Sequence, residues 1–212
     1  MSPPLPQEIF DLIIDFLHDE PDALKVCCIV SKSWVHQTRK HLFAHVEFSS
    51  KSHSKLWQTT FPDPSNSPAH NTRSLWIHTS EHFAFADISA GDRIHTFSGV
   101  VRLRVSIIAN GPEKISLVPL RGLSPTLKSL HLTCKCPATF SEIFCFVCSF
   151  PLLEDLVLVS ASVKHNETGE WNIPSTSPKL TGYLDVSSLV GSTPSCVDCW
   201  SSRMVFTSPR SR

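Results

Sequence analysis

The segments LKSLHL at residues 127–132 and LEDLVL at residues 153–158 carry the same spacing of leucines, Leu-x-x-Leu-x-Leu. Three looser copies of this pattern occur elsewhere in the chain. The second apolar position of each copy falls at residues 75, 103, 130, 156 and 183, so the steps between copies are 28, 27, 26 and 27 residues. Such even spacing predicts a repeated strand-and-return unit, and therefore an α/β fold. The looser copies comprise Thr72, Leu75 and Ile77, then Val100, Leu103 and Val105, and finally Leu180 and Tyr183.

A period of about 20–29 residues is typical of leucine-rich repeats, in which each copy supplies one strand and a helical or irregular return. Residues 141–150, SEIFCFVCSF, are expected to form a helix that ends before Pro151, and residues 152–159 are expected to form a strand. Residues 51–61 are also expected to form a helix, ahead of the first copy. The alternative is a set of unrelated short strands in an ordinary α/β domain.

Residues 5–17, LPQEIFDLIIDFL, are predicted to form a helix with Pro6 in its first turn, where a missing N–H costs nothing. Its apolar side chains cover an arc of about 200°, twice the stripe that a helix needs to pack on one core. The helix is therefore expected to be buried on two sides, once within the chain and once elsewhere. The alternative is a helix at the centre of a core that this chain forms alone.

Two further short helices are predicted after the first. Asp22 is a suitable N-cap for a helix over residues 23–30, and Ser31 is suitable for one that runs through Trp34 to about Phe43. Three short helices within about 45 residues cannot bury enough apolar surface to be stable alone. This helical module should therefore pack on the repeats or complete its core with a partner.

The same N-terminal residues resemble the F-box. The family pattern is Leu-Pro-x-Glu followed by Ile or Leu, then spaced Ile and Leu, a Leu that opens the second helix, and Val-Cys-Lys-x-Trp. The resemblance covers residues 5–45 and departs from the pattern at Ser31, where Cys is common, and in the slightly long stretch HDEPD at residues 18–22. An F-box followed by degenerate repeats also resembles the F-box-like families of mushroom-forming fungi. The matching residues are Leu5, Pro6, Glu8, Ile9, Ile13, Leu17, Leu24, Val30, Lys32 and Trp34.

This resemblance implies a substrate-recognition adaptor of an SCF-type cullin–RING ubiquitin ligase, with a Skp-type adaptor as its partner and, through it, a cullin. It implies a non-catalytic subunit without a cofactor, located in the cytoplasm, the nucleus or both. Two alternatives stay open: an F-box scaffold that works outside a ligase, and a truncated or inert product. The residues expected to contact or shape the adaptor surface are Leu5, Pro6, Ile9, Ile13, Leu17, Leu24, Val30 and Trp34.

The predicted strands suggest a second surface. Alternation along a strand places every second residue on the same face of a sheet. The residues between the core leucines should therefore lie together on the opposite face, where they could hold a protein substrate. The candidates for this substrate face are Trp76, His78, Arg102, Arg104, His131 and Thr133.

Composition argues against several other classes of function. The 212 residues carry 19 Lys and Arg against 19 Asp and Glu, so the net charge is zero and no basic surface for nucleic acid is indicated. No apolar run reaches the ~18 residues that cross a bilayer, and the first ten residues do not resemble a secretory signal. The chain has no phosphate-binding loop and no nucleophile elbow. We therefore predict no nucleic-acid partner, no membrane partner and no catalytic site.

The eight cysteines are expected to be reduced, because no export signal is recognised. Cys145 and Cys148 fall in the predicted apolar helix, where cysteine behaves as a small hydrophobe. Four other cysteines fall in expected loops and keep open the alternative of a zinc-binding protein, although we predict no bound metal. These four are Cys134, Cys136, Cys196 and Cys199.

These patterns predict an N-terminal three-helix F-box followed by a short, irregular leucine-rich-repeat-like solenoid. Its regions are an F-box over residues 1–48, a linker with the first helix over 49–70, a substrate-binding repeat domain over 71–190, and a tail over 191–212. The tail is rich in Ser, Thr, Pro and Arg and is expected to be disordered.

Overall fold

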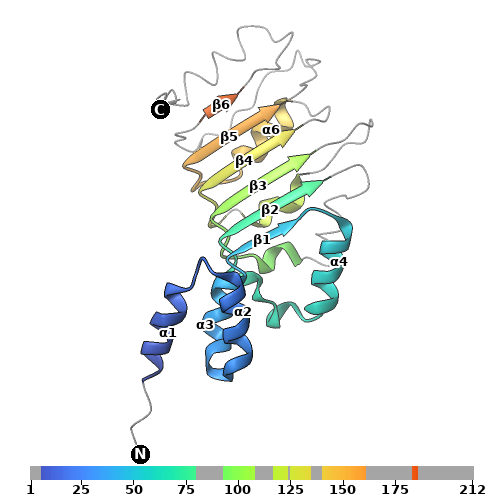
Figure 1. Ribbon diagram of the computed structural model, residues 1–212. Coiled ribbons are helices and arrows are strands. Elements are labelled where there is room, and N and C mark those ends of the chain that lie inside the picture. The colour runs from blue at the N-terminus through green and yellow to red at the C-terminus, as the bar shows by residue number, and fades with distance from the viewer. Residues whose placement is uncertain are drawn as a thin grey trace, which may run out of the picture.

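The computed structural model describes residues 6–79, 93–107, 117–123, 125–134, 140–160 and 183–185. A group of helices at the N-terminal end is followed by a parallel sheet, with further helices along one of its sides (Figure 1). The helical elements are α1 (Gln7–Phe16), α2 (Pro21–Val30), η1 (Lys32–Trp34), α3 (Val35–Leu42), α4 (Lys51–Thr60), η2 (Pro64–Asn66), η3 (Pro68–Asn71), η4 (Arg93–Thr96), η5 (Val118–Leu123) and α6 (Phe140–Val147). The strands are β1 (His45–Phe48), β2 (Ser74–Thr79), β3 (Arg102–Ile107), β4 (Ser129–Cys134), β5 (Asp155–Ser160) and β6 (Tyr183–Asp185).

All six strands are parallel and stand in the order in which they occur along the chain. The predicted leucine anchors are in register, because Leu75 pairs with Leu103, Leu103 with Leu130, and Leu130 with Leu156. The α/β fold class is thus confirmed. The leucine anchor occupies the same position in each of these strands. The even spacing of the anchors in the sequence therefore corresponds to the register of neighbouring strands.

The last strand departs from the predicted spacing by one residue. Tyr183, the expected anchor, pairs with Val157, and Leu184 pairs with the core residue Leu158. The anchor position of the fifth copy is therefore wrong in the sequence analysis. Of the template positions in this copy, only Leu180 holds a leucine. A shift of one residue exchanges the two faces of a strand.

The first strand, β1, was not predicted. Residues 45–48 follow directly on the helices, and Val46 pairs with Leu75 of β2. The exposure of β1 alternates, with Val46 and Phe48 buried and His45 and Glu47 exposed. Four residues without a leucine are too short to show the repeat. Helix α3 ends at Leu42, close to the predicted end at about Phe43, so β1 lies inside the region predicted as the F-box, residues 1–48.

The chain enters each of strands β2 to β5 through the same pair of hydrogen bonds. The Ala44 carbonyl accepts from the N–H groups of both Arg73 and Ser74, at 2.9 Å each. The carbonyls of Arg73, Val101 and Lys128 each accept in the same way from the two residues that open the next strand. This recurring contact stacks each turn of the chain on the one before it. It also gives hydrogen bonds to backbone groups that would otherwise lack a partner.

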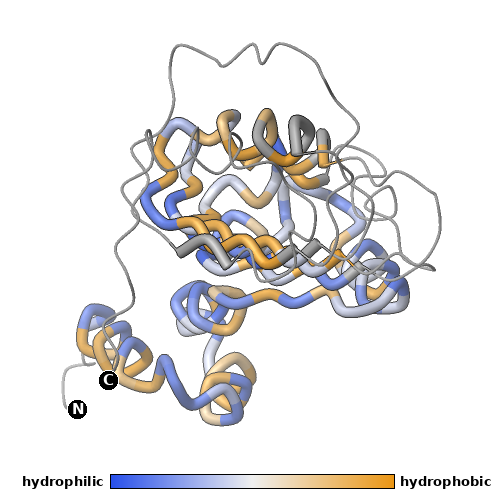
Figure 2. The backbone as a smooth tube through the Cα atoms, turned by 90° about the horizontal axis from the view of Figure 1, so that it is seen from above, coloured by the Kyte–Doolittle hydropathy of each residue, from blue (hydrophilic) through white to orange (hydrophobic). Residues whose placement is uncertain are grey.

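The main core lies between the sheet and the helical returns. Its members include the inward side chains of the strands, such as Leu103 and Leu130, and returns such as Phe146 of α6. At the β1 end, Trp57 of α4 packs against the ring of Phe48, with the ring centroids 5.7 Å apart. Figure 2, viewed from above, shows hydrophobic segments in both layers, with the N-terminal helices to one side, where α3 contacts η3.

The predicted helical segments correspond closely to the observed ones, with one correction. Residues 51–61 contain α4, and the predicted helix over residues 141–150 corresponds to α6, which begins one residue earlier and ends at Val147. The Ser31 hydroxyl accepts from the Ser33 N–H at the start of η1. Asp22, however, is not an N-cap: α2 begins at Pro21, and Asp22 lies within its first turn, 2.8 Å from the Lys25 ammonium. Proline opens the helix because it has no N–H to satisfy there.

No helix in the part of the chain that the structure describes is long and apolar enough to cross a membrane. The predicted tail over residues 191–212 lies outside the described residues.

Candidate functional site

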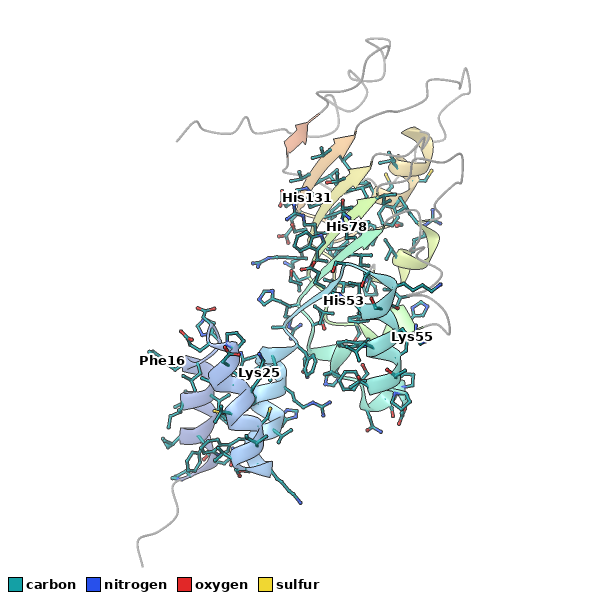
Figure 3. All side chains as sticks on the ribbon, turned by 45° about the vertical axis from the view of Figure 1, so that its right-hand side comes forward. Phe16, Lys25, His53, Lys55, His78 and His131 are labelled. Atoms are coloured by element: carbon teal, nitrogen blue, oxygen red, sulfur yellow. The ribbon has the colours of Figure 1, made fainter. Side chains whose placement is uncertain are left out.

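The apolar side chains of α1 face two sides of the helix, one packed within the chain and one exposed. Ile14 is buried within the chain, and Phe10 packs on Trp34 with the ring centroids 5.2 Å apart. Leu12, Ile13 and Phe16, on another side of α1, are exposed. Phe16 is 86% exposed and is seen at the outer side of the helical group in Figure 3. The wide arc predicted from the sequence therefore includes one packed side and one open side.

Helix α2 adds a second open apolar stripe. Leu24 is buried, whereas Val26, Ile29 and Val30 are exposed, with Ile29 at 85%. Their spacing of three and four residues places them on one side of α2. We call the exposed apolar residues of these two helices the apolar helical surface; its members are Ile9, Leu12, Ile13, Phe16, Val26, Ile29 and Val30.

A polar contact holds α1 on α3. One carboxylate oxygen of Asp15 lies 2.6 Å from Nε2 of His41, and the same oxygen accepts from the side-chain amide of Gln37. The hydrogen bond with His41 lowers the pKa of the Asp15 carboxyl, partial desolvation opposes this, and Gln37 lowers it further. This contact fixes the orientation of α1 and hence the direction in which its open side faces.

The eight residues predicted for adaptor binding fall into different environments. Pro6, Ile9, Ile13 and Val30 are exposed and available for contact. Leu24 is buried, and Leu17 and Trp34 are partly buried, so these three support the surface from inside. Leu5 lies outside the described residues.

Sequence reasoning missed four residues of the apolar helical surface, although a helical wheel contains the signal for them. Leu12 and Phe16 lie on the same apolar arc as Ile9 and Ile13. Val26 and Ile29 share the spacing of Val30 on α2. A family pattern marks only positions that recur among relatives, and these four do not belong to it.

The six residues predicted for the substrate face do come together. Trp76, Arg104 and His131 occupy equivalent positions on β2, β3 and β4 and form one row across the sheet. His78 and Thr133 belong to the next row, and Arg102 belongs to the row before it. Figure 3 shows His78 and His131 on the side of the sheet away from α6. We call this side the outer sheet face.

Arg104 is stacked on Trp76 at the centre of the outer sheet face. The guanidinium carbon lies 4.5 Å from the ring centroid of Trp76. Among the described residues, neither Arg102 nor Arg104 forms an ion pair with a carboxylate. The indole Nε1 of Trp76 is buried and has no hydrogen-bond partner in the described part of the chain. The face therefore presents an ordered arginine whose N–H donors are available.

His131 borders Arg104 in the same row. Desolvation and the nearby Arg104 charge lower the pKa of His131, and Asp155 acts weakly in the opposite direction. The imidazole is thus neutral near physiological pH, since its ordinary pKa of about 6.5 is reduced. Asp155 itself accepts a hydrogen bond from the Ser129 hydroxyl at 3.1 Å.

The cysteines show no assembled metal site within the described ranges. Over those residues, no three His, Cys, Asp or Glu side chains group in a way that could hold a metal ion. Cys145 is exposed on α6 and Cys148 is half-buried just after it, and burial raises the pKa of the Cys148 thiol. The pair predicted at Cys196 and Cys199 lies outside the described residues, as does Cys136.

Comparisons of the chain with protein-family models, with curated proteins and with solved structures found no match. We therefore infer the function from the chemistry of the apolar helical surface and of the outer sheet face.

Proposed function

We propose that this protein is a substrate-recognition adaptor of an SCF-type cullin–RING ubiquitin ligase. The N-terminal helices act as an F-box that docks on a Skp-type adaptor. The sheet region acts as a short leucine-rich-repeat-like solenoid that holds a protein substrate on its outer face. The chain itself is non-catalytic, and it works in the cytoplasm, the nucleus or both, where cullin ligases operate.

The apolar helical surface is the observation that carries this proposal. Monomeric proteins rarely leave neighbouring large apolar side chains uncovered unless a partner covers them. Here Phe16 and Ile29 are more than four-fifths exposed, and Ile13 is half exposed. The open side of α1 contains Ile9 and Ile13, two of the positions that resemble the F-box pattern. Burial of such side chains contributes roughly 1.5–3 kcal/mol each to association or folding.

The outer sheet face supports the second half of the proposal. Tryptophan and arginine are the residue types that most often dominate protein–protein binding energy. Trp76 and Arg104 lie next to each other at its centre, and the described helices that pack on the sheet lie along its other side (Figure 1). A ligase adaptor needs only to hold its substrate close to the catalytic subunit, because proximity itself accelerates the transfer.

The test is co-expression of the full chain with a fungal Skp-type adaptor, followed by size-exclusion chromatography. The wild-type chain should elute as a one-to-one complex. Ile13→Asp should abolish this complex, because it places an unpaired charge in an apolar interface. Leu152→Asp is the matched control: Leu152 is 50% exposed and Ile13 is 51% exposed. Leu152 directly precedes β5, whereas the N-terminal helices lie at the β1 end of the sheet (Figure 1).

Loss of the complex in both aspartate variants would indicate misfolding, and a soluble wild-type chain that ignores the adaptor would overturn the proposal. Addition of a cullin to the purified complex then separates two roles. A ternary complex supports a ligase subunit, whereas a stable adaptor complex that excludes the cullin indicates a scaffold outside the ligase.

A further inference from the structure

We propose that the outer sheet face recognises an extended, acidic protein segment in which two acidic side chains are separated by one residue. This inference rests on the proposed function and specifies its substrate class. The receptor is formed by Arg102 and Arg104 of β3, with Trp76 as the support on which Arg104 is ordered.

Stacking explains why Arg104 is suited to this role. A guanidinium has five N–H donors in a rigid plane, and it binds a carboxylate or phosphate through two parallel hydrogen bonds. The guanidinium carbon lies 4.5 Å from the centroid of the Trp76 ring, and the Arg104 side chain is otherwise exposed. Because the side chain is already ordered, less conformational entropy is lost when an anion binds.

The spacing of the two arginines determines the spacing of the acidic residues in the peptide that they bind. Arg102 and Arg104 are alternate residues of one strand, so they leave the same face about 6.6 Å apart. An extended peptide repeats its side chains on one face at the same interval. A segment lying along β3 can therefore place one acidic group on each arginine only if a single residue separates its acids.

The acidic groups of the face leave these arginines free. Glu47 of β1 and Asp155 of β5 each lie two strands from β3, a separation of about 10 Å. Asp155 is engaged by the Ser129 hydroxyl. The neighbour between Arg104 and β5 is His131, whose imidazole is neutral near physiological pH and does not compete for an anion.

The test uses fluorescein-labelled peptides and the complex of the full chain with its Skp-type adaptor. One peptide is Gly-Ser-Glu-Thr-Glu-Ser-Gly, and its isomer Gly-Ser-Glu-Glu-Thr-Ser-Gly has the same charge and composition. Fluorescence anisotropy at low salt should show that the spaced peptide binds several-fold more tightly than the isomer. A third peptide, with phosphoserine in place of both spaced glutamates, shows whether phosphate or carboxylate is the preferred group.

Matched variants connect the binding to the arginine. Arg104→Gln should weaken binding of the spaced peptide by about tenfold, the effect of losing a charged hydrogen bond. Arg104→Lys should also weaken it, because lysine keeps the charge without the planar fork. Arg121→Gln removes an equal charge from the exposed Arg121 of η5 and should leave binding unchanged.

Equal affinity for the two isomers, or equal losses in Arg104→Gln and Arg121→Gln, would overturn the inference. Hydrogen exchange of the sheet amides in Arg104→Gln shows whether the sheet of the variant is folded, and adaptor binding is measured on the same samples. If the adaptor complex forms and no peptide binds, this inference fails while the proposed function stands. If the spaced peptide binds a chain that ignores the adaptor, the peptide site stands and the F-box proposal fails.

Discussion

The helical region and the sheet region bury their apolar residues to very different extents. Within the described ranges, the main core consists of residues from β1 onward, whereas Ile14 of α1 and Leu24 of α2 are buried apart from it. Seven of the nine large exposed hydrophobic residues of the described chain lie on α1 and α2; the others are Leu56 and Leu152. The sheet region therefore covers its own core, whereas the helical region leaves large apolar side chains exposed.

This difference shows how one chain can combine a self-sufficient part with an incomplete one. The parallel strands satisfy one another's backbone groups, and the helical returns cover their inner side chains. The three helices form a layer too thin to cover both sides of α1. Under the proposed function a partner covers the open side, and its binding free energy would then also stabilise the three helices.

Replacing one buried leucine in each region should give the largest contrast. Leu130→Ala removes a fully buried side chain at the centre of the sheet and should lower the free energy of unfolding of the sheet by about 2–5 kcal/mol. Leu24→Ala, in α2, should raise hydrogen exchange within α1 to α3 but leave the sheet protected. Hydrogen–deuterium exchange read by mass spectrometry on the full chain measures both.

Loss of protection in the sheet upon Leu24→Ala, as large as that upon Leu130→Ala, would contradict this picture. The two regions would then unfold as one cooperative unit, and the helices would be stabilised mainly by the sheet.

A glycine at the junction of two turns should give the next largest effect. A Cβ on Gly99 would lie 2.5 Å from the carbonyl oxygen of His70, which is backbone and cannot move aside. Gly99→Ala should therefore lower the free energy of unfolding by about 1–3 kcal/mol, measured by urea denaturation.

Gly122 provides the control for this prediction, because a Cβ there would also lie 2.5 Å from a neighbour, the ring of His95. A side chain can rotate away, so Gly122→Ala should be less destabilising than Gly99→Ala. The reverse order would show that the turns do not stack as closely as the backbone contact indicates.

Lowering the pH should weaken the packing of α1 on α3, with a smaller effect on stability than the glycine substitution. The pKa of Asp15 is lowered in the folded chain from its ordinary value of 3.8, chiefly by the hydrogen bond with His41. The contact therefore stabilises α1 on α3 above this value and is lost as the pH falls through the lowered folded pKa. Because Asp15 is partly exposed, the contribution stays below about 1 kcal/mol.

Asp15→Asn at neutral pH should reproduce this loosening, seen as faster exchange of the α1 amides. Asp22→Asn is the control, since the partner of Asp22 is Lys25 within the same helix. Unchanged exchange in Asp15→Asn would mean that Phe10 and Ile14 alone position α1.

Local patterns predicted the elements whose signals lie within a single segment. The strands around Leu103, Leu130 and Leu156, and the helices at residues 51–61 and 141–150, follow from leucine spacing and helix periodicity. Strand β1 was not predicted, because four residues carry too little pattern and are specified by pairing with β2. The shift at Tyr183 has the same origin: register belongs to two strands, and one strand alone does not fix it.

Three features can be recognised from the amino-acid sequence alone: the repeat spacing, the wide apolar arc of α1 and the set of polar residues between the core leucines. Each of these is a periodicity along the chain, and periodicity is a local property. Two others follow from tertiary contacts: Leu24 is internal while Phe16 and Ile29 are exposed, and Arg104 stacks on Trp76. Exposure and stacking depend on which segments distant in the chain come to lie side by side, because contact between them is a property of pairs.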